Sequence, residues 1–108
     1  MSKDIDKLLE DARNRAASYG RLYGVKETAD DFLKTVYATL YDSAPPGTVP
    51  ERDSWIKRQP EYCEAVERKR DAYADYKCAE TYLRLLFAQV SVYQTNSAND
   101  RYLDKAHQ

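Results

Sequence analysis

Basic side chains interleaved with aromatic ones are the residues whose types and spacing best suit chemistry with a partner. Arg70, Lys77 and Arg84 lie seven positions apart, so on a helix they share one stripe that can follow a phosphate backbone. The predicted nucleic-acid surface comprises Trp55, Lys57, Arg58, Arg68, Lys69, Arg70, Lys77 and Arg84. Acidic residues alternate with them, so the segment fits equally well a solvated face with ion pairs such as Glu80–Arg84.

Tyrosine is the second chemical signal, with ten copies in 108 residues. Three pairs stand three or four positions apart, which places each pair on one helix face: Tyr19 with Tyr23, Tyr37 with Tyr41, and Tyr73 with Tyr76. Such faces can stack unpaired bases. They also fit an amphipathic core, in which the ring is buried and the hydroxyl reaches the rim. The core interpretation is favoured because no basic groove accompanies the pairs.

Catalytic and metal-binding patterns do not emerge from the sequence. The single histidine, His107, stands beside the C-terminus, so no nucleophile has a histidine base near it in sequence. Two clusters of acidic residues lack opposing metal ligands at a defined spacing, and we interpret them as surface and helix N-terminal charges. They are Asp4, Asp6, Glu10 and Asp11, and the pair Asp30–Asp31. We therefore expect no catalytic residue, no metal site, no cofactor and no enzymatic activity.

Composition narrows the class of protein. The length of 108 residues predicts a single domain, and 43% hydrophobic residues is too many for a disordered chain. A net charge of −1 argues against a binder held to nucleic acid by bulk positive charge. The first ten residues resemble no signal peptide, and no apolar run reaches the roughly 18 residues of a membrane span. We expect a cytoplasmic protein without a membrane partner.

The cysteines agree with that compartment. Cys63 and Cys78 stand fifteen positions apart in one predicted helix, a separation of roughly 22 Å. A disulfide requires Cα atoms about 4.4–6.8 Å apart, so the two thiols are expected to stay free, as in a reducing cytoplasm.

Helical periodicity organises both halves of the chain. Apolar residues at steps of three and four predict a first arm over about 3–42. Gly20 and Gly24 leave two alternatives open, a continuous or bent helix and a pair of shorter helices. The segment DSAPPGTVP predicts a loop over 43–50, followed by a short helix over 51–58 that Pro50 can open. A second arm is expected over about 60–94, or as far as 105 if the polar segment TNSAND does not fray it.

These elements predict an all-α fold, a long antiparallel helical hairpin with a proline-rich connecting loop. The segment TYLRLLFAQVSVY, residues 81–93, is apolar in nearly every direction around a helix axis, whereas one partner arm covers one stripe. We therefore expect assembly into a helical-bundle oligomer. The residues assigned to self-association are Leu83, Leu86, Phe87, Val90 and Tyr93. The alternative is a monomeric bundle, in which the first arm folds back at its glycines and covers both sides.

Three segments resemble small helical proteins that tailed phages and prophages encode in recombination gene clusters: YGRLYG, WIKRQPEYCEAVERKRDAYADYKCAE and LRLLFAQVSVYQTNSANDR. The resemblance implies a protein loosely similar to recombination mediators, which oligomerise and bind single-stranded DNA or a recombination protein in the bacterial host cytoplasm. The alternative is a phage-encoded inhibitor or adaptor of a host enzyme or defence complex, which small size and many tyrosines also suit.

Overall fold

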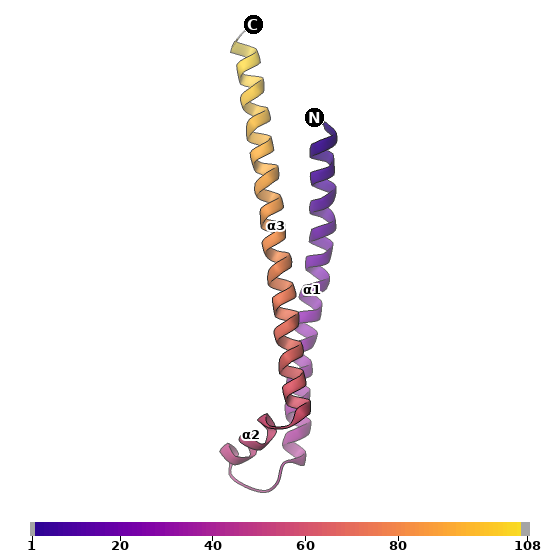
Figure 1. Cartoon of the computed structure of the whole chain (residues 1–108), viewed down its shortest axis with the longest axis vertical. Coiled ribbons are helices and arrows are strands. Elements are labelled where there is room, and N and C mark those ends of the chain that lie inside the picture. The colour runs from indigo at the N-terminus through magenta and orange to yellow at the C-terminus, as the bar shows by residue number, and fades with distance from the viewer. Residues whose placement is uncertain (1, 107–108) are drawn as a thin grey trace. The chain divides into compact units, whose positions relative to one another are not determined.

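The chain folds into three helices in the residues that the structure, a computed structural model, describes, which are 2–106. Helix α1 is Ser2–Ser43, α2 is Val49–Lys57 and α3 is Pro60–Ala106 (Figure 1). No strand occurs within that range, which confirms the all-α prediction. His107 lies outside the described residues, as do the side chains before Asp4.

Proline and threonine punctuate the chain between α1 and α2. Residues 44–48 are non-helical and include Pro45 and Pro46, which have no N–H to continue a helix. Thr48 caps α2, since its hydroxyl accepts a hydrogen bond of 3.3 Å from the backbone N–H of Glu51. Pro50 stands in the first turn. On the other side, the guanidinium of Arg52 donates a 2.6 Å hydrogen bond to the carbonyl of Tyr41, in the last turn of α1.

Two segments that weaken helices in isolation are helical here. Helix α1 continues through Gly20 and Gly24 without a break. Helix α3 continues through TNSAND to Ala106, beyond the boundary at residue 94. In that polar segment, the Thr95 hydroxyl donates to the carbonyl of Ser91 at 3.0 Å and Arg101 Nε donates to the carbonyl of Ser97 at 3.4 Å. Side chains that compete for the backbone elsewhere thus bond within the helix.

The contacts divide the chain into two compact units. The central unit is Arg21–Lys77, and it contains α2 with the adjoining parts of α1 and α3. The terminal unit is Met1–Gly20 with Cys78–Gln108, and it contains the remaining parts of α1 and α3.

In the central unit, α1 and α3 pack as an antiparallel pair. Buried and half-buried positions recur along both helices at steps of three, four or seven, as in a coiled coil. On α1 they include Lys26, Ala29, Leu33, Val36 and Leu40, and on α3 they include Tyr62, Ala65, Ala72 and Tyr76. Ring contacts cross the pair, with Tyr37 near Tyr62 and Tyr23 near Tyr76. Ile56 of α2 is the only large side chain of this unit that is fully buried among the described residues.

In the terminal unit the same spacing recurs. The covered positions of α1 include Ile5, Leu8, Ala12 and Tyr19, and those of α3 include Leu83, Leu86, Val90, Tyr93 and Ser97. Ala12 and Val90 are the most deeply buried of these. The guanidinium of Arg15 lies 5.1 Å from the centroid of the Tyr82 ring, a cation–π contact between the two helices.

The large rings of α3 are not its buried residues. Tyr73 and Phe87 are 47% and 57% exposed. Ala65 and Ala72 take the buried positions instead. Alanine has no side chain beyond Cβ, so it lets two backbones approach closely, and the larger rings are displaced to the flanks.

No helix within residues 2–106 has the length and apolarity of a membrane span.

Candidate functional site

Most of the predicted nucleic-acid residues have partners within the protein. Lys57 Nζ lies 3.0 Å from Asp53 Oδ2, and Lys69 Nζ lies 3.0 Å from Asp30 Oδ1 across the antiparallel pair. In the terminal unit, Arg84 Nη2 lies 3.0 Å from Glu80 Oε1, the ion pair expected from the sequence. A carboxylate therefore neutralises each of these basic groups locally, which reduces the positive potential that a phosphate backbone would meet.

Aromatic rings engage other cationic groups. The guanidinium of Arg68 lies 5.0 Å from the centroid of the Phe32 ring. Lys77 Nζ lies 5.6 Å from the Tyr73 ring and 5.9 Å from the Tyr76 ring. Arg58 and Arg70 are exposed, and Trp55 is half-buried in α2. Arg70 and Lys77 belong to the central unit and Arg84 to the terminal unit, so the predicted stripe divides between the two units.

The pKa values of the paired acidic and basic groups reflect these ion pairs. The hydrogen bond from Lys69 is the main cause that lowers the pKa of Asp30, while partial desolvation opposes it. The pKa of Lys57 is raised, above all by its hydrogen bond to Asp53. Both shifts favour the charged forms, as expected for groups in ion pairs. The Lys69–Asp30 pair joins α3 to α1, and the Lys57–Asp53 pair lies within α2.

A cation–tyrosine cluster in the central unit was not found from the sequence. Lys26 occupies a position that faces α3, and its Nζ lies 5.3 Å from the Tyr23 ring and 5.1 Å from the Tyr76 ring. The two rings are themselves 5.8 Å apart. The hydrogen bond to Glu27 raises the pKa of Lys26. Part of the signal is visible in the sequence as a lysine three positions after Tyr23, but Tyr76 belongs to the other helix and joins the cluster only when the helices pack.

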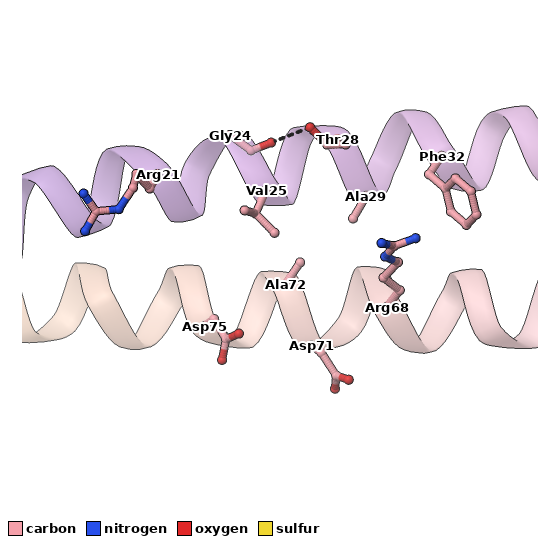
Figure 2. A pocket seen from close by; sticks show the side chains of 10 residues that line it. All are labelled: Arg21, Gly24, Val25, Thr28, Ala29, Phe32, Arg68, Asp71, Ala72 and Asp75. Carbon is pink, nitrogen blue, oxygen red and sulfur yellow. Dashed lines mark hydrogen bonds between the residues drawn. The ribbon is translucent and has the colours of Figure 1, made fainter.

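A groove of about 770 Å³ lies on the central unit between α1 and α3. Figure 2 shows Val25 and Ala29 of α1 pointing toward Ala72 and Arg68 of α3. The groove exists because the residues at its centre are small; Gly24 has no side chain, and the Thr28 hydroxyl bonds back to the Gly24 carbonyl at 2.9 Å. Arg21, Arg68, Asp71 and Asp75 line it with both signs of charge. Catalytic or ligand-specific chemistry would need convergent polar groups, whereas this lining is open and mixed.

The residues assigned to self-association divide into two sets. Leu83, Leu86 and Tyr93 are half-buried and Val90 is buried within the terminal unit, so they already serve the packing of α3 in one chain. Phe87 is exposed. Three further apolar side chains of the same segment, which the prediction did not include, are exposed as well: Tyr82, Leu85 and Val92. The apolar surface of this segment is therefore wider than one packing stripe.

Reactive groups are sparse in the described part of the chain. Cys63 and Cys78 are exposed and unbridged. Within the described residues no three His, Cys, Asp or Glu side chains come together to hold a metal ion. Comparison of the chain with protein-family models, with curated proteins and with solved structures finds no match.

Proposed function

We propose that this chain is a non-enzymatic helical interaction module that assembles with itself through the terminal unit and binds another protein, as an adaptor or inhibitor. The observation that carries the proposal is the apolar surface of residues 81–93. Leu85, Phe87 and Val92 are 57%, 57% and 59% exposed. Only Glu80 and Arg84 bring charge to residues 78–93. Exposed apolar surface concentrated in this way is typical of protein interaction sites.

The energetics support self-association. Burial of each large apolar side chain contributes about 1.5–3 kcal/mol, so two or three from each copy stabilise a dimer. The free thiols at Cys63 and Cys78 suit work in a reducing bacterial cytoplasm.

Sedimentation velocity across about 1–200 µM protein tests the proposal, because this range covers the dissociation constants of modest interfaces. We expect the sedimentation coefficient to rise with concentration. A folded single subunit at the highest concentration would contradict the self-association part. The partner is then sought by affinity capture from bacterial lysate, where one stoichiometric protein is expected to elute without nucleic acid.

A second candidate function is that of a phage-type accessory protein in DNA recombination or replication that binds single-stranded DNA. The observation in its favour is the half-exposed Tyr73 ring with Lys77 Nζ at 5.6 Å, because an aromatic face beside a cation suits a stacked base next to its phosphate. Exposed Arg70 lies on the same helix, one turn before it.

Fluorescence anisotropy with single-stranded DNA at about 50 mM salt tests this candidate, since phosphate-driven affinity is strong under those conditions. Binding that weakens with salt and with Tyr73→Ala would support it. Tyr102→Ala is the matched control, because Tyr102 is also exposed but lies in the terminal unit. No binding to the wild-type chain at low salt would exclude this candidate.

A further inference from the structure

A second row of side chains runs along α3 in the terminal unit, beside the row that packs within one chain. Its members recur at alternating steps of four and three, and every one is exposed. This outer row comprises Cys78, Tyr82, Leu85, Gln89, Val92, Asn96, Asn99 and Leu103. It extends over about 38 Å of helix, more than three heptads. Its centre lies about 100° around the axis from the packed row of Leu83, Leu86, Val90 and Tyr93.

The outer row carries no charge. The charged residues of the segment 78–103 are Glu80, Arg84, Asp100 and Arg101, and all of them fall outside the row. In contrast, half of residues 60–77 are charged. A row of this kind meets an identical row without repulsion between like charges.

The row is also ordered along its length. Its first half is Cys78, Tyr82, Leu85 and Gln89, in which Tyr82 and Leu85 are 51% and 57% exposed and Gln89 is the one amide. Its second half is Val92, Asn96, Asn99 and Leu103, in which two of the four residues are amides. Spacing of this type, with a few amides among apolar residues, is how coiled coils specify both partner and register.

We propose that the outer row is the seam of a homodimer in which two α3 helices lie parallel and in register. This inference rests on the proposed self-association. It adds which surface of the chain is buried, that a second copy covers it, and that the two α3 helices run parallel. Each residue of the row then meets the same residue of the second copy across a twofold axis. The α1 helix packs along the other row and reaches the outer row at Tyr82, where the Arg15 guanidinium lies 5.1 Å from the centroid of the ring.

The order of apolar and amide residues selects the parallel direction. In register, Leu85 faces Leu85 and Asn96 faces Asn96, so amides pair with amides. With full antiparallel overlap, Leu85 would face Asn96 and Tyr82 would face Asn99. Each amide would then lose hydrogen-bonding water without gaining a matched partner, which is unfavourable.

Cys78 reports on this geometry because it opens the row. In the parallel dimer, the two Cys78 side chains face each other at a separation that a disulfide can bridge. In the antiparallel dimer, Cys78 would face Leu103, which leaves the two thiols about 38 Å apart along the helix. Glutathione disulfide supplies the oxidant: one Cys78 thiolate displaces a glutathione thiol, and the second Cys78 displaces the other as the protein disulfide forms.

The experiment compares two single-cysteine variants of the full chain. Cys63→Ser retains Cys78 in the row, and Cys78→Ser retains Cys63, which is also exposed but lies in the central unit. At about 10 µM protein we expect Cys78 to form the covalent dimer at least about tenfold faster than Cys63, because a paired thiol has an effective concentration near the millimolar range. Equal rates in a chain that sediments as a dimer would overturn the parallel register.

A second comparison identifies the face. Leu85 and Phe87 are both 57% exposed, but Phe87 lies about 200° further around the helix. We expect Leu85→Glu to sediment as a monomer and Phe87→Glu to remain a dimer, with circular dichroism unchanged in both. The opposite result would overturn the seam while leaving self-association intact. A wild-type chain that stays monomeric would overturn the seam together with the self-association part of the proposed function.

Discussion

The phenol of Tyr37 on α1 donates a 2.7 Å hydrogen bond to Asp53 Oδ1 on α2. The second carboxylate oxygen of Asp53 pairs with Lys57 one turn later, at 3.0 Å. The bond from Tyr37 is the main cause that holds the pKa of Asp53 below its ordinary value, and the bond from Lys57 adds to it. The short helix α2 is thus attached to the antiparallel pair by a charged group at a partly exposed site.

This relationship predicts a pH dependence of stability. Because the folded pKa of Asp53 is depressed, its contribution is present above the unfolded value of about 3.9 and is lost as pH falls through the folded pKa. We expect Asp53→Asn to flatten the acid limb of a plot of melting temperature against pH. Asp71→Asn, which removes an exposed carboxylate from the same unit, is the control and should leave that limb in place. An unchanged acid limb in Asp53→Asn would contradict the assignment.

At high pH the Tyr37 phenol gives stability the opposite dependence on pH, so that stability falls as pH rises. The hydrogen bond to Asp53 is the main cause that raises the pKa of Tyr37. Stability from this proton is complete below the unfolded value of about 10 and is lost as pH rises through the folded pKa. We expect Tyr37→Phe to lower the melting temperature at pH 7 and to weaken its decline above pH 10. A variant as alkali-sensitive as wild type would count against the bond.

Ile56 is the anchor of α2, with 0% of its surface exposed. Replacement by alanine removes buried methyl groups and leaves a cavity, so we expect Ile56→Ala to lower the free energy of unfolding by about 2–5 kcal/mol. Urea denaturation measures this value. Val49→Ala in the same helix is the control, because Val49 is 68% exposed, and its effect should stay within about 0.5 kcal/mol. Similar losses in both variants would mean that α2 does not depend on its buried side.

The buried alanines set the spacing of the central pair. Ala72 is 5% exposed, so Ala72→Leu would force three extra carbon atoms between the helices. We expect a loss of about 1–3 kcal/mol in the free energy of unfolding. Ala74→Leu, at an exposed position of the same helix, should change it by no more than about 0.5 kcal/mol. A neutral Ala72→Leu would show that the helices can separate without cost.

Substitutions at the glycines of α1 are expected to stabilise the protein rather than destabilise it. A Cβ placed on Gly20 or Gly24 would meet nothing within 4 Å. Alanine costs less backbone entropy in a helix, so we expect Gly20→Ala and Gly24→Ala each to raise the free energy of unfolding by about 0.5–1 kcal/mol. Gly47 lies outside the helices, and a Cβ placed on it would lie 2.7 Å from Glu51 Oε2. Gly47→Ala is therefore expected to bring no such gain, and thermal unfolding compares the three variants.

Helical periodicity and proline chemistry were sufficient to predict where the helices form. The absence of proline and glycine after Pro60 predicts a long α3, and the prolines near residue 45 predict the end of α1, because both effects act through the backbone of neighbouring residues. The start of α2 at Val49 and the continuation of α3 to Ala106 were less well predicted. Capping by Thr48 marks the start of α2, and hydrogen bonds from the Thr95 and Arg101 side chains to backbone carbonyls support the last turns of α3.

The candidate site was only partly predictable. The ion pair of Glu80 with Arg84 follows from a spacing of four along one helix. The pair of Lys69 with Asp30 and the contact of Arg68 with Phe32 join two helices, and no spacing within one segment predicts them. They depend on the register of the antiparallel pair, which arises when the two helices pack.

The sequence alone determined that the chain is helical, where its main interruption falls, and that residues 81–93 are apolar in several directions. Only the tertiary structure decided which direction is covered, because α3 offers more than one row at helical spacing and local periodicity ranks them equally. The choice came from size: Ala65 and Ala72 let α1 approach closely in the central unit, whereas Tyr73 would hold it away. In the terminal unit α1 covers Leu86 and Val90, which leaves Leu85 and Val92 exposed.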